Sequence, residues 1–223
     1  MYDDVRLRPM GEHDLPFVVR EHRRYFPTGF FARLGPRFLT AYYRTFLTDP
    51  EARCVLAEAD GEPLGYVVGL TDPAAHRDHV VRRHGPELVL RAAAAMLVRP
   101  WLAVRFLRTR SGLYARKLLL PRRSPDGRVP AGQTAVLTQV CVTPEARSCG
   151  LGSRLIDRFD LEAAAAGCAE LLLVTASDDG AGPYYRKRGW DACDERCTPD
   201  GLHLTTYRRP VARHDPNRDE QSA

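Results

Sequence analysis

The first part of the chain alternates between strand-like and helix-like spacing of its apolar residues. Polar and apolar side chains alternate over residues 4–8, as they do in a half-buried strand. Residues 15–22 carry apolar side chains three or four positions apart, which predicts a helix. The same spacing, now with many aromatic residues, predicts a second helix over 30–46, interrupted at Gly35-Pro36.

A β-hairpin is predicted next, followed by a basic helical segment. Residues 54–59 and 63–70 are two apolar runs with Asp60 and Gly61 between them, and an Asp-Gly pair in that position is the strongest short hairpin signal. From residue 71 to 132 the spacing becomes helical, and the segment ends in a loop rich in Pro and Gly.

Strands and helices then alternate toward the C-terminus. The pattern predicts strands at 134–142, 170–175 and 202–207 and helices at 153–166 and 182–187. Gly167 suits the left-handed residue that often ends a helix. Residues 208–223 are polar and predict a frayed tail, so we expect one domain over 1–209, with a helical insertion at about 73–132 and a disordered tail at 210–223.

Composition supports one soluble globular domain. The chain has 223 residues, 44% hydrophobic and 27% charged, which excludes wholesale disorder and a polytopic membrane protein. Residues 88–107 are mostly apolar, but three arginines and Pro100 interrupt them, so a membrane span is not expected. No secretory signal precedes the polar start, and no cysteine spacing matches a disulfide framework or a zinc site, so we expect reduced thiols and a cytoplasmic protein.

The charge is unevenly distributed. Lys and Arg number 33 against 28 Asp and Glu, a net charge of +5, and residues 88–125 contain no acidic residue. This stretch is either a solvated helix face or a surface for an anionic partner. Its cations are Arg91, Arg99, Arg105, Arg108, Arg110, Arg116, Lys117, Arg122 and Arg123. His76, His79 and His84 resemble a metal tract only loosely, and we expect no metal.

The passage with a chemical signature follows the strand at 134–142. Gly150 and Gly152 stand where a loop enters an apolar helix. Glycine allows the backbone to approach a ligand closely, and the free N–H groups at a helix start bind anions such as a pyrophosphate. The third glycine of a dinucleotide-binding loop and the Gly-Lys-Ser/Thr of a P-loop are both missing, so neither of those sites is predicted.

Here the sequence resembles the GCN5-related N-acetyltransferase (GNAT) superfamily. Residues Arg147-Ser148-Cys149-Gly150-Leu151-Gly152 match the family's R/Q-x-x-G-x-G/A acetyl-CoA loop. Residues 178–190 resemble its N-x-x-A-x-x-x-Y-x-x-x-G-F motif, with Asp178 in place of the Asn and Trp190 in place of the Phe. The close match covers 133–192, and the order of elements agrees over nearly all the rest.

The resemblance implies roles for particular residues. Pantetheine would bond to the backbone of Val140, Cys141 and Val142, with the Val140 N–H polarising the thioester carbonyl. The N–H groups from Arg147 through Ser153 would hold the pyrophosphate, and Tyr185 would protonate the leaving thiolate, unless it is only a packed core residue. The implied cofactor-binding residues are Val140, Cys141, Val142, Arg147, Ser148, Cys149, Gly150, Leu151, Gly152, Ser153, Asp178 and Tyr185.

The general base is not assigned by the resemblance. Some members use a glutamate early in the strand that precedes the loop, where this chain has Val136, with Gln139 further along. Water relays, Glu58, Asp72 and Asp178 all stay open as sources of the base.

The expected fold is therefore α/β, a GNAT-like mixed, mostly antiparallel twisted sheet with splayed central strands, flanked by helices. The expected reaction transfers an acetyl group from acetyl-CoA to an amine by direct attack in a ternary complex. We expect a small-molecule or peptide amine as the acceptor, with an anionic amine as one option, and no nucleic acid as a partner. The protein is expected to be a monomer or a homodimer. The alternatives are a CoA-binding regulatory module with little activity and a membrane-surface acyltransferase acting on a lipid-linked or polymeric amine.

Overall fold

A single seven-stranded sheet runs through the molecule. The computed structural model describes residues 4–27, 29–109, 134–177, 180–198 and 201–211, with the backbone alone at 105–109. The strand order is β1-β2-β3-β4-β5-β7-β6, and every neighbouring pair is antiparallel except β4–β5, which is parallel. The strands are β1 (Arg6–Pro9), β2 (Ala52–Ala59), β3 (Glu62–Leu70), β4 (Thr134–Val142), β5 (Glu170–Ala176), β6 (Asp191–Cys197) and β7 (His203–Pro210).

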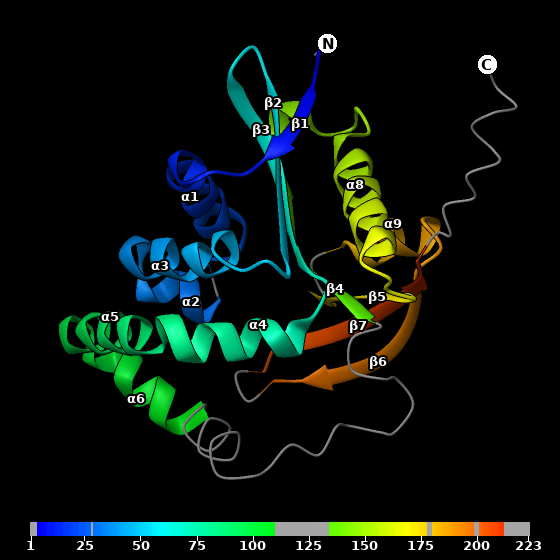
Figure 1. Cartoon of the computed structure of the whole chain (residues 1–223). Coiled ribbons are helices and arrows are strands. Elements are labelled where there is room, and N and C mark those ends of the chain that lie inside the picture. Colours follow the sequence, from blue (N-terminus) through cyan, green and yellow to red (C-terminus); the bar gives the residue numbers. More distant parts are fainter. Residues whose placement is uncertain (1–3, 28, 110–133, 178–179, 199–200, 212–223) are drawn as a thin grey trace, which may run out of the picture.

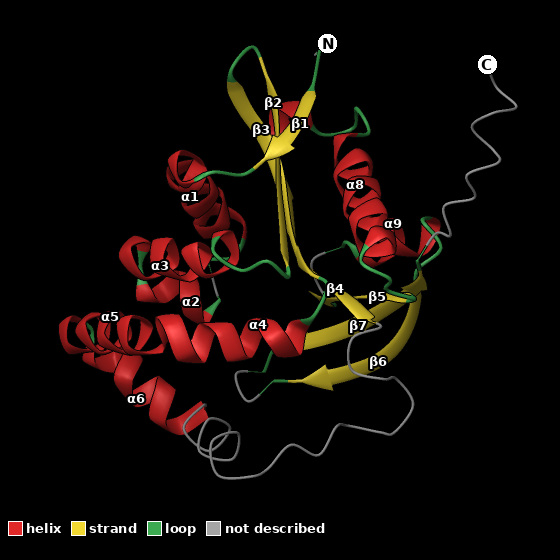
Figure 2. Cartoon of the chain, viewed as in Figure 1, coloured by secondary structure: helices red, strands yellow, loops and turns green. Residues whose placement is uncertain are grey.

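Helices cover both faces of this sheet. Helices α1, α2 and α3 lie on one side of strands β1–β3, and α8 and α9 lie on the other (Figure 1). Strands β1–β3 and β5–β7 run in clearly different directions, so the sheet is strongly twisted (Figure 2). The helices are α1 (Leu15–Tyr25), α2 (Phe30–Leu34), α3 (Pro36–Leu47), α4 (Pro73–His79), α5 (Gly85–Val98), α6 (Pro100–Thr109), α8 (Leu151–Ala165) and α9 (Gly182–Lys187), with a π-helical turn at Val80–His84 between α4 and α5.

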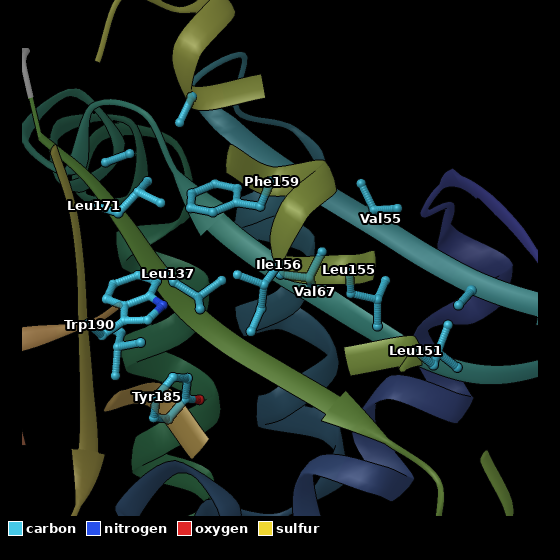
Figure 3. Close-up of a cluster of buried hydrophobic side chains, with 14 of the residues drawn as sticks. Val55, Val67, Leu137, Leu151, Leu155, Ile156, Phe159, Leu171, Tyr185 and Trp190 are labelled. Carbon is cyan, nitrogen blue, oxygen red and sulfur yellow. The ribbon is translucent and has the colours of Figure 1, made fainter. Parts of the chain in front are cut away.

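Each face of the sheet has its own hydrophobic core. The α8 side buries a cluster that includes Leu155, Ile156, Phe159 and Trp190 (Figure 3). Phe159 lies so close to β3 that a Cβ atom on Gly69 would be 2.3 Å from its ring. The opposite side packs α1 and α3 over the other face of β2–β4, and a third, smaller cluster joins α2, α3, α5 and α6.

The elements confirm most of the sequence pattern. The predicted hairpin is β2–β3, and Asp60 and Gly61 at its turn have φ values of 52° and 78°, as a type I′ turn requires. Residues 134–142 and 182–187 are β4 and α9 as predicted. The helix predicted at 153–166 begins earlier, at Leu151, and Gly167 does adopt a left-handed conformation.

Two expectations from the pattern were wrong. Strand β6 was not predicted, because this edge strand is exposed along its whole length and so lacks alternating apolar residues. The frayed tail was placed too early, since β7 continues to Pro210 and the Val211 N–H donates to the Ala169 carbonyl at 3.0 Å. Residues 212–223, and residues 110–133 of the basic segment, lie outside the described part of the chain.

Candidate active site

The central feature of the site is an opening between the two parallel strands. Strand β4 pairs with β5 only from Thr134 to Leu137, opposite Glu170 to Leu173. Beyond Leu137 the described chain shows no β4–β5 pairing, although β4 continues to Val142 and β5 to Ala176. The splayed central strands implied by the resemblance are therefore present.

A β-bulge marks the point where the strands separate. Val68 lies opposite Gln139, whereas Gly69 lies opposite Leu137, so Thr138 is an extra residue on β4. A bulge of this kind bends its strand and increases the local twist. Here it coincides with the last β4–β5 pair, which accounts for the divergence of β4 from β5.

The open edge of β4 exposes backbone groups to this gap. The Thr143 N–H donates to the Leu64 carbonyl at 2.8 Å, and Tyr66 lies opposite Cys141. In an antiparallel pair, residues that exchange both hydrogen bonds alternate with residues whose backbone groups point to the other edge. Val140 and Val142 belong to the second kind, so their N–H and C=O groups are directed toward the β5 side.

The loop after β4 brings a helix start to the end of this opening. Gly150 has a φ of 79°, and a Cβ atom there would meet nothing within 4 Å. No side chain caps α8, and the first helical hydrogen bond at its start runs from the Arg154 N–H to the Gly150 carbonyl at 3.0 Å. The N–H groups of Leu151, Gly152 and Ser153 therefore have no helical acceptor, which is the arrangement that favours an anion.

Other residues of the predicted loop have local partners. The Arg147 N–H donates to the Pro144 carbonyl at 3.2 Å, and its Nε donates to the Val142 carbonyl at 3.2 Å. Cys149 is exposed, and its Sγ lies 2.8 Å from the Ala146 carbonyl oxygen. Ser148 has a φ of 64°, so two residues of this short loop, Ser148 and Gly150, are left-handed.

Tyr185 lies in the packed core on the α8 side. Its ring centroid is 6.1 Å from that of Trp190 and 5.8 Å from that of Tyr207, and the side chain is buried. Val140 and Val142 pack against the same cluster, so the open edge of β4 borders the core that contains Tyr185. The neighbouring Tyr184 is exposed instead, with its hydroxyl 3.4 Å from that of Ser153.

Comparison with solved structures supports the same fold. An acetyltransferase from Thermus thermophilus is 18% identical, covers 94% of this chain and 99% of its own, and has a TM-score of 0.55. An N-acetyltransferase from Staphylococcus aureus is 15% identical, with 94% and 99% covered and a TM-score of 0.58. A Salmonella typhimurium protein solved with its cofactor acetyl-CoA is also 15% identical, with 95% and 96% covered and a TM-score of 0.54.

At the sequence level, no curated protein matches the chain. Residues 127–210 match the family model described as an acetyltransferase (GNAT) domain, a range that contains β4, α8 and α9. Over these residues the chain is similar to GNAT acetyltransferases, and over nearly its whole length it shares the fold of the solved acetyltransferases.

The face of β4 that packs against α1 and α3 carries a buried polar network that the sequence did not reveal. His22 on α1 has its Nδ1 2.8 Å from the Tyr43 hydroxyl and 3.0 Å from Nε2 of Gln139 on β4. The Tyr43 hydroxyl also donates to the Gln139 side-chain oxygen and lies 3.2 Å from the Tyr66 hydroxyl. Burial lowers the pKa of His22 and raises the pKa of Tyr43 well above its ordinary value.

The candidate bases have other partners. Glu58 on β2 accepts from Arg8 at 2.7 Å, and Asp72 caps α4 by accepting from the N–H groups of Ala74 and Ala75. Asp178 lies outside the described residues. Neither Glu58 nor Asp72 is thus directed at the β4–β5 opening, and Val136 lies before it, within the paired part of β4.

The described histidines His76, His79 and His84 and the described part of the basic segment lie away from the β4–β5 opening. His76 pairs with Asp49, and His79 and His84 both contact the Thr48 hydroxyl. Among the described cations, Arg91 pairs with Glu87 at 2.8 Å and Arg99 donates to the Arg33 carbonyl at 3.2 Å. The side chains of the remaining cations lie outside the described part of the chain: Arg105, Arg108, Arg110, Arg116, Lys117, Arg122 and Arg123. None of the described helices is long and apolar enough to cross a membrane.

Proposed function

We propose that this acetyltransferase moves an acetyl group from acetyl-CoA to an amine, by direct attack of the amine within a ternary complex. The observation that carries the proposal is the open edge of β4, with the backbone groups of Val140 and Val142 directed into the gap, next to the uncapped start of α8. An extended pantetheine needs backbone partners along a strand, and a pyrophosphate needs converging N–H donors. Both requirements are met in one continuous stretch of chain.

The Val140 N–H is the proposed oxyanion donor. The acceptor's ammonium group first loses a proton to solvent, because only the neutral amine has a lone pair. As the amine nitrogen attacks the thioester carbon, negative charge develops on the carbonyl oxygen, and a fixed backbone N–H stabilises it. The nitrogen loses a further proton to solvent as the amide forms and the carbon–sulfur bond breaks. The N–H groups of Ser148 through Ser153 are the proposed pyrophosphate donors, because the Arg147 N–H is already bonded to Pro144. Arg147 would release the Val142 carbonyl when pantetheine takes that edge.

Tyr185 is the proposed general acid. When the carbon–sulfur bond breaks, the thiolate takes a proton, and a phenolic hydroxyl can donate one. Cys141 is not a suitable nucleophile, because burial raises the pKa of its thiol to about 12 and keeps it protonated. Its side chain also belongs to the core on the α1 side. These properties favour direct transfer over an acyl-cysteine intermediate.

Calorimetry with acetyl-CoA tests the donor site. Gly150→Asp places a carboxylate at the uncapped helix start, and Gly150→Asn is the matched control, since both residues tolerate a left-handed backbone equally well. We expect acetyl-CoA to bind Gly150→Asp about tenfold or more weakly than Gly150→Asn, because like charges repel at the anion site. Equal affinity of the two folded variants would show that the pyrophosphate does not bind at this loop.

A further inference from the structure

Two unpartnered polar atoms lie on one face of α1. Phe17, Glu21 and Tyr25 are spaced four residues apart, so their side chains follow one another along the same side of the helix. The Glu21 side chain is only 2% exposed. Its Oε2 and the Tyr25 hydroxyl are both buried without a hydrogen-bond partner among the described residues.

Contacts on either side of Glu21 place this face over the open part of β4. One turn before it, the Phe17 ring meets the Tyr66 ring edge-on at 6.4 Å, and Tyr66 is the cross-strand partner of Cys141. One turn after it, the Tyr25 ring lies 4.8 Å from the guanidinium carbon of Arg147. Arg147 in turn donates to the Val142 carbonyl. Glu21, between these two contacts, therefore lies on the α1 side of the part of β4 that has no β5 partner.

The carboxylate of Glu21 is only half satisfied by protein groups. Its Oε1 accepts from Arg20 Nε at 2.9 Å, whereas Arg24 Nη1 is 3.9 Å from Oε2, too far for a hydrogen bond. A buried oxygen without a donor costs free energy, and such atoms are rare in folded proteins. A ligand with several N–H donors, such as a primary ammonium group, would satisfy both Glu21 Oε2 and the Tyr25 hydroxyl.

The surrounding charges restrict what else this ligand carries. Arg20 and Arg24 flank Glu21, and the guanidinium groups of Arg24 and Arg147 lie 5.6 Å and 4.8 Å from the centre of the Tyr25 ring. A simple alkylammonium would add a positive charge to a cluster that already holds more cations than anions. An acceptor with an acidic group near its amine adds no net charge, and the acidic group can pair with an arginine.

We propose that Glu21 and Tyr25 bind the ammonium group of the acceptor, and that Arg24 pairs with an anionic group carried beside it. The acceptor class is then a primary amine with a nearby carboxylate or comparable acid. This inference rests on the proposed acetyl transfer and names the acceptor of that same site. The competing interpretation is that Glu21 only holds Arg20 and Arg24 in place on the helix surface.

Matched pairs of small amines test the site. Thiol release from acetyl-CoA is measured with glycine, β-alanine and γ-aminobutyrate, each against the alkylamine of the same chain length: ethylamine, propylamine and butylamine. We expect the wild-type protein to have a higher kcat/KM for the amino acid of at least one pair. Arg24→Gln should remove this preference, because only the acid-bearing probes use the guanidinium.

Two variants of α1 separate the amine contacts from the acid contact. Glu21→Gln should raise KM about tenfold or more for both members of a pair, since a charged hydrogen-bond partner is lost. Tyr25→Phe keeps the ring and removes only the hydroxyl, so the expected rise is about two- to tenfold. Glu12→Gln is the control, because Glu12 also pairs with an arginine, Arg44, but is mostly exposed.

These experiments distinguish failure of the acceptor site from failure of the proposed function. Calorimetry should show unchanged acetyl-CoA affinity in Glu21→Gln and Tyr25→Phe. An unchanged KM in both variants, with acetyl-CoA still bound, would overturn the acceptor site alone. Failure of the wild-type protein to acetylate any of the six probes would overturn the assigned acceptor class, and failure of the wild-type protein to bind acetyl-CoA would overturn the proposed function itself.

Discussion

Protonation of His22 should destabilise the fold below neutral pH. The side chain is 5% exposed and lies among Tyr43 of α3, Tyr66 of β3, Gln139 of β4 and the Phe26 ring, which is 5.3 Å away. Its Nδ1 is within hydrogen-bond distance of the Tyr43 hydroxyl and the Gln139 amide, and neither partner carries a charge. A second proton on the ring would therefore bury a positive charge with no opposite charge among these partners.

The sign and size of the effect follow from proton linkage. Burial lowers the pKa of His22 in the folded protein below its ordinary 6.5, so below this value the unfolded chain binds more protons than the native one. The free energy of unfolding therefore falls as the pH falls. One proton changes it by at most about 1.4 kcal/mol per pH unit. If His22 stays neutral throughout, the loss between pH 7 and pH 5 approaches about 2 kcal/mol.

Urea unfolding at a series of pH values measures this term. His22→Gln is the comparison, because glutamine keeps polar atoms for the network but does not titrate. Carboxylates and the other buried histidine, His76, titrate in both proteins, so their effects cancel in the difference. We subtract the free energy of unfolding of His22→Gln from that of the wild type. This difference should decrease by up to about 2 kcal/mol as the pH falls from 7 to 5. Parallel pH profiles for the two proteins would refute the buried, neutral His22.

Two further substitutions test the core and the general acid. Gly69→Ala should lower the free energy of unfolding by about 1–3 kcal/mol, because its Cβ would meet the Phe159 ring at 2.3 Å, and Phe159→Leu should recover part of the loss in urea unfolding. No loss of stability in Gly69→Ala would contradict the close packing of α8 on β3. Tyr185→Phe should lower turnover about 10²–10⁴-fold in the thiol-release assay, with little change in acetyl-CoA affinity. The control Tyr184→Phe should leave turnover unchanged. Equal turnover of Tyr185→Phe and wild type, with chemistry rate-limiting, would mean that Tyr185 is only a packing residue.

The elements that were predicted correctly from the sequence depend on residues that are adjacent in the chain. The Asp60-Gly61 turn requires two positive φ values, and these residue types provide them at little cost. Gly150 meets a similar requirement at the start of α8. Strand β6 was missed for the opposite reason: as an exposed edge strand it is held by pairing with β7, and this pairing leaves no apolar alternation in its own residues.

The candidate site also has one part that depends on neighbours in the chain and one part that depends on packing. Its donor side is one continuous stretch, from Val140 through Ser153, in which strand, left-handed turn and helix start follow each other directly. A motif can describe such a stretch because its geometry depends on neighbours in the chain. The sequence still could not show that the Arg147 N–H is bonded to Pro144, since that depends on the short helical turn at Pro144–Ala146.

The acceptor side has no such continuity. Glu21 and Tyr25 of the proposed acceptor site lie on α1, whereas Arg147 follows β4, and packing alone brings these segments together. Along the chain Glu21 looks like an ordinary helix-surface carboxylate between arginines, and only its burial and its unpartnered oxygen distinguish it. If Glu21, Tyr25 and Arg24 bind the acceptor, its specificity should follow changes on α1 while the loop at Gly150 stays the same.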